Sequence, residues 1–237
     1  LAKEQVAYAK TTVNGDNKWF LGKSDDVSDK VSWIIDDYRN ISKHDGNKKY
    51  DVITCVEMAE HVGIKNFQPF LSQVKNMLKD DGLFYIQMAG VRRTWSYEDI
   101  IWILFMGKYI FPGADASTPI NWVIQELERA GFEIHRLESL GCHYARTIQL
   151  WHENWINNKD NVINKYGKRW FRLWDIFLAW SCIIANQGTS NVYMITCNKN
   201  SFCDISSIQT KYNKTQNIPK LNRSKKFIGP DLISYQQ

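Results

Sequence analysis

YDVITCV, at residues 50–56, is a run of β-branched and apolar residues, and the polar stretch EMAEH follows it at residues 57–61. Such a composition favours a buried strand. An amphipathic segment follows at residues 67–78, and a second apolar run, LFYIQM, follows at residues 83–88. A strand, a crossover helix and a second strand make one parallel unit of an α/β sheet. The sequence therefore predicts an α/β fold built outward from this unit.

The same alternation of helix and strand continues on both sides of this unit. Further helices are expected at residues 1–12, 120–130, 145–158 and 168–185. Further strands are expected at residues 31–35, 132–140 and 191–197. The polar residues 42–49 indicate a loop, and residues 80–82 (Asp-Asp-Gly) indicate a turn. Short buried strands separated by helices predict a mainly parallel sheet that is covered on both faces.

Composition limits the class of protein. The 237 residues suit one α/β domain, and 44% hydrophobic with 23% charged residues excludes wholesale disorder. The longest uncharged stretch, residues 176–198, is interrupted by the polar run NQGTSN, so a membrane span is not expected. The five cysteines form no CxxC pair, so we expect neither a zinc site nor a disulfide framework. This use of cysteine indicates a reducing compartment.

The positive charge is confined to the end of the chain. The last forty residues hold seven basic and two acidic residues, which accounts for the whole formal charge of +5. Residues 200–237 are therefore expected to form a basic flexible tail, which either keeps the protein soluble or touches phosphates or anionic lipid. Because residues 1–197 are neutral overall, no nucleic-acid partner is expected.

Several motifs occur in a recognisable order. They are LAKEQ, DDYRN, YDVITCVEMAEHVG, KDDGLFYIQMAG, KYIFPGADAS, LERAGFEI, GCHYARTIQLW and YGKRWFRLW. Together they resemble the cyclopropane-fatty-acyl-phospholipid synthase and mycolic acid methyltransferase family, and within it the fungal sphingolipid C9-methyltransferases. The resemblance covers residues 1–199, which would then form a methyltransferase domain followed by the tail.

The resemblance implies a Rossmann-like class I methyltransferase fold that uses S-adenosylmethionine. In that class the seven strands run in the order 3-2-1-4-5-7-6. The first two strands and a Gly-rich turn for the cofactor are then expected before Leu1, so that the chain would be the C-terminal portion of the domain. No G-x-G-x-x-G motif occurs in the 237 residues.

The resemblance also implies that six residues bind the cofactor: Leu1, Ala2, Gln5, Asp37, Tyr38 and Arg39. The first three match a segment that borders the ribose. The last three follow the strand expected at residues 31–35, where an acid can accept from adenine N6 and a planar side chain can pack on the ring. Adenine and ribose offer hydrogen-bonding groups of this kind, so the assignment is chemically consistent.

Three residues are assigned to the active site: Glu60, Gln87 and Tyr144. In the resembled family the glutamate helps to hold a bicarbonate-like base, and Tyr144 matches the family's active-site tyrosine. A phenol ring can also stabilise a carbocation. Fatty-acyl cyclopropane synthases carry histidine at the position of Gln87, and an amide cannot titrate. The identity of the base therefore stays open, and no metal ion is expected.

The implied reaction is methyl transfer to C9 of the sphingoid base of a ceramide or glucosylceramide precursor, through a carbocation at a double bond. Apolar helices at about residues 96–185 are expected to face lipid, at a membrane surface on the cytoplasmic side of the endoplasmic reticulum or Golgi. Two alternatives stay open. One is a non-catalytic lipid-binding remnant, and the other is a cyclopropane fatty acid synthase-like enzyme acting on phospholipid acyl chains.

Overall fold

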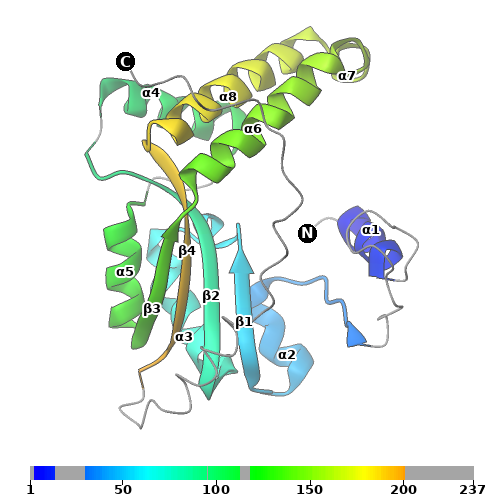
Figure 1. Cartoon of the computed structure of the whole chain (residues 1–237). Coiled ribbons are helices and arrows are strands. Elements are labelled where there is room, and N and C mark those ends of the chain that lie inside the picture. Colours follow the sequence, from blue (N-terminus) through cyan, green and yellow to red (C-terminus); the bar gives the residue numbers. More distant parts are fainter. Residues whose placement is uncertain (1–2, 14–29, 95, 113–117, 201–237) are drawn as a thin grey trace, which may run out of the picture.

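The computed structural model describes residues 3–13, 30–94, 96–112 and 118–200. A sheet of four strands in the order β1-β2-β4-β3 lies at its centre. The strands are β1 (Tyr50–Val56), β2 (Leu78–Val91), β3 (Phe132–Ser139) and β4 (Ser190–Lys199). Figure 1 shows helices packed behind this sheet and a second group of helices above it. The tail predicted at residues 200–237 lies, after its first residue, outside the described residues.

Strand direction distinguishes β4 from its neighbours. β1 and β2 pair in parallel, whereas β4 runs antiparallel to both β2 and β3. β1, β2 and β3 therefore point the same way, and their carboxyl ends meet at the upper edge of the sheet in Figure 1. The order agrees with the last four positions of the expected 3-2-1-4-5-7-6 arrangement. The predicted mainly parallel sheet is only partly correct, because β1–β2 is the one parallel ladder in the described part of the chain.

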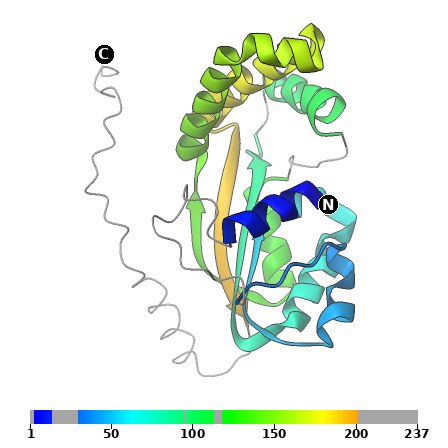
Figure 2. The ribbon, with the colours of Figure 1, turned by 90° about the vertical axis from the view of Figure 1, so that its right-hand side faces the viewer.

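The core lies between the sheet and two helices, α3 (Ile64–Met77) and α5 (Ile120–Arg129). Alternate residues of β2 point towards these helices, and Phe84, Ile86 and Met88 are almost fully buried. This alternation is typical of a strand with one face on the core. Figure 2 shows the helices along that face of the sheet. On β1 the alternate residues Val52 and Val56 are about half exposed, so the described residues do not bury its second face, contrary to prediction.

The upper group of helices follows the carboxyl ends of β2 and β3. It contains α4 (Tyr97–Phe105), the π-helical turn η4 (Met106–Ile110), α6 (Gly141–Asn157), α7 (Lys159–Tyr166) and α8 (Lys168–Asn186). α6 and α8 lie side by side, where the rings of Trp155 and Phe171 stack at 5.9 Å. Gly141 allows α6 to begin close to both β4 and α8, because a Cβ there would lie 2.9 Å from Asn191 Oδ1 and 3.3 Å from Ala185 O. Within the described ranges, no helix has the length and apolar character to span a membrane.

Several local predictions are wrong. Residues 31–35 form no strand: they have no regular secondary structure and are exposed, because they pair with no strand of the described sheet. The loop expected at residues 42–49 contains a short helix, α2 (Ile41–Asp45), ended by Gly46 in the left-handed region. The turn expected at residues 80–82 is an irregularity within β2, where the register jumps from Tyr50↔Leu78 to Val52↔Leu83. α7 was not expected, and Gly167, at φ 86°, separates it from α8.

Candidate active site

A cavity of about 480 Å³ lies at the carboxyl edge of β1 and β2, beneath the upper helices. Its walls are mostly apolar and come from α4, η4, α6 and α8. The side chains of Trp102, Met106, Ile148, Trp151, Phe177 and Leu178 belong to these walls. The residues that follow β1 add Glu57, Glu60 and His61, and α6 adds Tyr144. The cavity therefore joins an apolar space to an acidic group of side chains.

Gln87 connects the acidic residues to Tyr144. Its Nε2 donates to Glu57 Oε1 at 3.0 Å and to the Tyr144 hydroxyl oxygen at 2.9 Å. The Tyr144 hydroxyl donates to the same Glu57 Oε1 at 2.8 Å. Gln87 Oε1 accepts from the Tyr85 hydroxyl at 3.0 Å, which fixes the orientation of the amide. The structure thus brings together two of the predicted catalytic residues, Gln87 and Tyr144, around a carboxylate that was not predicted.

That carboxylate belongs to Glu57, the first residue after β1. Its φ of 52° lies in the left-handed region, which is strained for a side chain of this size. The backbone N–H donates to Gln87 O at 3.0 Å, so the bend is held by the neighbouring strand. The sequence signal was available, because an acid directly after a parallel strand lies at the edge where α/β proteins bind ligands. Of the two acids after β1, only Glu60 was predicted as a site residue.

Glu60 lies in the short 3-10 turn η3 (Ala59–His61) and is 7% exposed. Burial raises the pKa of its carboxyl from 4.5 to about 7, and the nearby negative charge of Glu57 acts in the same direction. Its Oε2 has no hydrogen-bond partner among the described residues. Buried carboxyl groups with a perturbed pKa beside a cavity are common at functional sites, where they transfer protons or stabilise positive charge.

Tyr144 lies in the first turn of α6, which begins after β3 ends at the same edge of the sheet. Burial raises the pKa of its phenol, and the hydrogen bond to Glu57 raises it further. Tyr144 therefore remains a hydrogen-bond donor throughout the neutral pH range. His61 is exposed at the cavity, and its ring makes no hydrogen bond to another described residue.

Aromatic residues build the roof of the cavity. Trp102 of α4 is 4% exposed and stacks on Phe177 of α8 with their planes 9° apart. α4 itself is fixed by Asp99, whose carboxylate accepts from the backbone N–H of Ser96 and from Arg92 Nη2, both within 2.9 Å. Packed rings over the cavity keep water from its apolar part.

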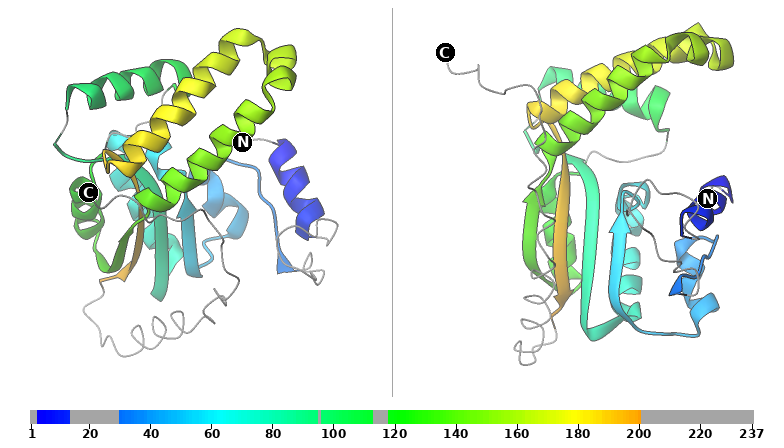
Figure 3. Two further views of the ribbon diagram at one scale, coloured as in Figure 1. Left: turned by 45° about the horizontal axis from the view of Figure 1, so that its top comes forward. Right: turned by 45° about the vertical axis from the view of Figure 1, so that its right-hand side comes forward.

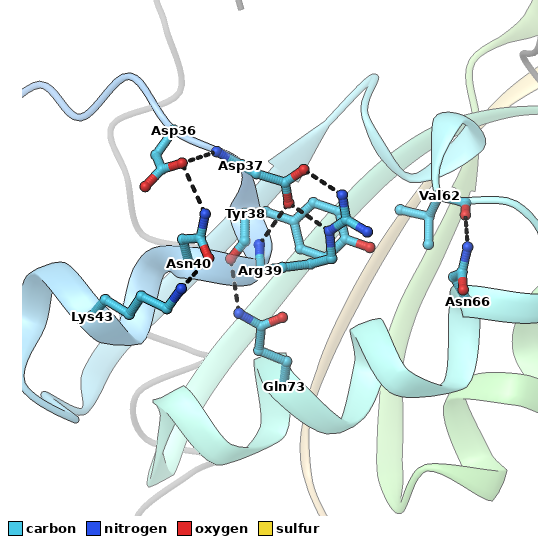
Figure 4. A network of polar contacts seen from close by, with 9 residues as sticks. All are labelled: Asp36, Asp37, Tyr38, Arg39, Asn40, Lys43, Val62, Asn66 and Gln73. Carbon is cyan, nitrogen blue, oxygen red and sulfur yellow. Dashed lines mark hydrogen bonds and ion pairs between the residues drawn. The ribbon is translucent and has the colours of Figure 1, made fainter.

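The residues predicted to bind adenine form a separate cluster before β1, shown in Figure 4. Asp37 caps the 3-10 turn η2 (Tyr38–Asn40), and its two carboxylate oxygens accept from Arg39. These hydrogen bonds lower the pKa of Asp37 to about 2. The Tyr38 ring meets Phe70 edge-on at 5.5 Å, and its carbonyl oxygen accepts from Gln73. The cluster is thus anchored to α3.

The predicted ribose contacts lie apart from this cluster. Gln5 is exposed on α1 (Lys3–Val13), which Figures 1 and 3 show to one side of the sheet. Leu1 and Ala2 lie outside the described residues. The structure therefore groups Gln87 and Tyr144, places Glu60 at the same cavity, and does not join Gln5 to them. Over the described ranges, no three His, Cys, Asp or Glu side chains are grouped to hold a metal ion.

Comparison with known proteins identifies the family. Residues 1–195 match the family model described as mycolic acid cyclopropane synthetase. The chain belongs to this family. The family predicted from the motifs is confirmed, and the match extends from α1 through most of β4.

Two curated relatives share about half of their aligned residues with this chain. The sphingolipid C9-methyltransferase of Komagataella phaffii is 52% identical over 179 residues, which are 73% of this chain and 37% of that protein. Sphingolipid C9-methyltransferase 2 of Gibberella zeae is 51% identical over 182 residues, which are 76% of this chain and 34% of that protein. The chain spans about a third of the length of these relatives.

A solved structure of the family has the same fold. Mycolic acid cyclopropane synthase CmaA1, complexed with SAH and CTAB, matches with a TM-score of 0.61 at 24% identity. The match covers 64% of this chain and 56% of that one. The predicted Rossmann-like class I methyltransferase sheet is therefore confirmed for the part of the fold that the chain contains.

Proposed function

We propose that this chain carries the catalytic residues of an enzyme that transfers the methyl group of S-adenosylmethionine to C9 of the sphingoid base of a ceramide or glucosylceramide precursor. One observation carries the proposal: an apolar cavity of about 480 Å³ that is lined at one side by Glu57, Glu60 and Tyr144. The half-identical relatives named sphingolipid C9-methyltransferases support the choice of substrate.

The residues of the cavity fit a cationic methyl donor. Two glutamates line it, whereas no lysine or arginine does so in the described part of the chain. When bound, S-adenosylmethionine supplies an electrophilic methyl group on a positively charged sulfur. Tyr38 and Asp37 would hold its adenine, and Gln5 its ribose, as the resemblance implies. The carboxylates stabilise positive charge, and this stabilisation is stronger away from water.

The chemistry explains why the cavity combines apolar walls with acids. A carbon–carbon double bond is a weak nucleophile, so the reacting atoms must be held close and in line. Forming the new carbon–carbon bond leaves a cation on the neighbouring carbon. Trp102 and Phe177 exclude water that would trap this cation, and the acidic side chains stabilise it. Loss of a proton from the methylated carbon then gives a methyl-branched alkene.

The two alternatives share this cavity. A cyclopropane synthase-like enzyme would remove the proton from the new methyl group instead, and would close a three-membered ring. A non-catalytic remnant would hold the lipid and transfer nothing. The described structure offers Gln87, not an imidazole, at the position where the resembled synthases carry histidine, and this supports simple methylation.

We also propose that the upper helices contact a membrane surface, on the cytoplasmic side of the endoplasmic reticulum or Golgi. Exposed apolar side chains gather on α4, α6 and α8: Ile100, Leu104, Trp151, Trp170, Ile176 and Ile183. Exposed basic residues lie near the start of α8, among them Lys168, Arg169 and Arg172. Apolar area combined with positive charge favours binding at an anionic lipid interface.

Incubation of the complete protein with S-adenosylmethionine and a glucosylceramide that contains a Δ8 double bond tests the function. We expect a product that is heavier by one methylene group, with the branch located at C9 by fragmentation. The saturated glucosylceramide is the matched control and should not react. A cyclopropane product would support the synthase-like alternative. Binding of the lipid without any product would support the remnant.

A further inference from the structure

We propose that Glu57 is the general base of this reaction, and that Tyr144 and Gln87 are positioning residues that hold its carboxylate. The inference rests on the proposed methyl transfer, because a cation formed at a double bond must lose a proton to give a stable product. None of the sequence motifs singled out Glu57. Its assignment comes from the geometry at the carboxyl edge of β1.

The Glu57 carboxylate is held from one side. Tyr144 and Gln87 both donate to its Oε1, at 2.8 and 3.0 Å. Gln87 is in turn held by the Tyr85 hydroxyl, so both donors have fixed directions. The hydrogen bonds from Tyr144 and Gln87 both go to Oε1, and the Glu60 carboxyl, when protonated, shares a hydrogen bond with the Glu57 side chain. We assign Oε2 of Glu57 as the oxygen that receives a proton from a ligand in the cavity. Charge-assisted hydrogen bonds of this kind fix a carboxylate in place without protonating it.

The backbone supports the same conclusion. The left-handed φ of Glu57 and its N–H bond to Gln87 O turn the chain sharply after β1. A strained conformation at a side chain that lines a cavity is a known property of functional positions. A purely structural acid here could have been replaced by glycine, which adopts this φ without strain.

Two other groups at the cavity could accept a proton, Glu60 and His61. Glu60 is buried, and its raised pKa means that it already holds a proton through part of the neutral range. The His61 ring is not fixed by any hydrogen bond to a described residue. Two carboxyl groups in different environments commonly divide their roles. Glu57 is the more exposed of the pair, and its carboxylate is the one that Tyr144 and Gln87 hold.

The proposed reaction forms one carbon–carbon bond and then removes one proton. The π electrons of the double bond form the new bond to the methyl carbon, and the electron pair of the broken S–CH₃ bond stays on sulfur. The neighbouring carbon is left positive. Glu57 Oε2 takes the proton from the carbon that received the methyl group, and the electrons of that C–H bond restore the double bond. The carboxylic acid then returns its proton to water.

Glu57→Gln in the complete protein tests the proposal, because it keeps the size of the side chain and removes the base. We expect kcat to fall by roughly 10² to 10⁴-fold, the usual contribution of a general base, with the KM for the lipid near the wild-type value. Glu153→Gln, the same change on the exposed side of α6, is the matched control and should keep the wild-type kcat.

A second variant separates chemistry from folding. Glu57→Ala leaves space beside Tyr144 and Gln87, and added sodium formate should restore part of its turnover by supplying a carboxylate. A structural role would not respond to formate. Thermal melts of both variants show whether the fold survives.

Three results would overturn the inference. The first is a Glu57→Gln variant that keeps more than a tenth of the wild-type kcat. The second is a folded Glu57→Ala variant that formate does not rescue. The third is a wild-type rate that depends on added bicarbonate, which would make bicarbonate the base. In each of these cases the wild-type protein still methylates the lipid, and the proposed function stands. A wild-type protein without methyl transfer would overturn the proposed function, and the inference with it.

Discussion

Tyr144 connects two parts of the fold through one hydroxyl group. The phenol comes from α6, whereas its partners Glu57 and Gln87 follow or belong to the parallel pair β1–β2. Tyr144→Phe removes this hydroxyl and keeps the ring in place. We expect turnover to fall by about 10²-fold with the fold intact, because the Glu57 carboxylate loses the donor that holds it in place. A steady-state assay checks the rate, and wild-type turnover would exclude the hydroxyl from the reaction.

Glu60 makes the stability of the protein depend on pH. Its pKa is raised by folding from 4.5 to about 7, so the folded state binds more protons than the unfolded state between these values. The contribution of Glu60 is therefore favourable below pH 4.5 and is lost as the pH rises through 7. Glu60→Gln should abolish this dependence. The free energy of unfolding of wild type minus that of Glu60→Gln should fall by on the order of 3 kcal/mol from about pH 5 to about pH 8.

Urea titrations at several pH values measure this difference. The matched control is Glu153→Gln, because Glu153 is exposed and should give a difference that does not change with pH. A difference that rises with pH would mean that ionised Glu60 is stabilised by the fold and that the direction of its pKa shift is wrong.

Individual residues also show where sequence reasoning reaches its limit. Gln87 and Tyr144 were predicted from motifs, and the structure places them within hydrogen-bonding distance. Glu57 was missed although it stands next to a correctly predicted strand. Its importance depends on a positive φ and on contacts to residues 30 and 87 positions away, and neither is encoded in a local pattern.

Among the elements, strands with a buried face were predicted best. β1 has the predicted bounds, and the alternation of β3 and β4 located both strands to within a few residues. Residues 31–35 have the same composition as a buried strand but pair with no described strand. The composition of a segment indicates that it suits a β-sheet, whereas strand pairing depends on partner strands elsewhere in the molecule. The same limit explains why the antiparallel direction of β4 was not predicted.

The upper helices lead to a prediction about lipid binding. Ile176 on α8 is 51% exposed, and Ile64, at the start of α3 and outside the upper helices, is 53% exposed. Ile176→Glu should weaken binding to vesicles of phosphatidylcholine and phosphatidylserine, because a carboxylate there opposes both the apolar contact and the anionic surface. Ile64→Glu is the matched control and should bind as wild type. Co-sedimentation measures both, and equal binding would exclude α8 from the contact.

For the whole molecule, the sheet edge at β1 is the feature that most affects behaviour in solution. Val52 and Val56 are 53% and 54% exposed on this strand, and β2 is its one neighbour in the described sheet. An open strand with exposed apolar residues favours pairing with another chain. We expect the 237-residue chain to self-associate, and Val52→Lys to reduce the association, since an edge lysine opposes strand pairing. Light scattering at matched concentrations measures the effect, and unchanged scattering would contradict this prediction.

Laboratory selection for thermal stability and selection for catalytic turnover would favour different residues at position 57. Glycine accepts a φ of 52° freely, whereas glutamate there costs roughly 1 kcal/mol or more. Libraries screened only for survival at high temperature should therefore accumulate glycine or asparagine at this site and lose the carboxylate. The thermostable variants selected in this way would then lack activity. Directed evolution for a stable enzyme would therefore have to measure turnover in every round.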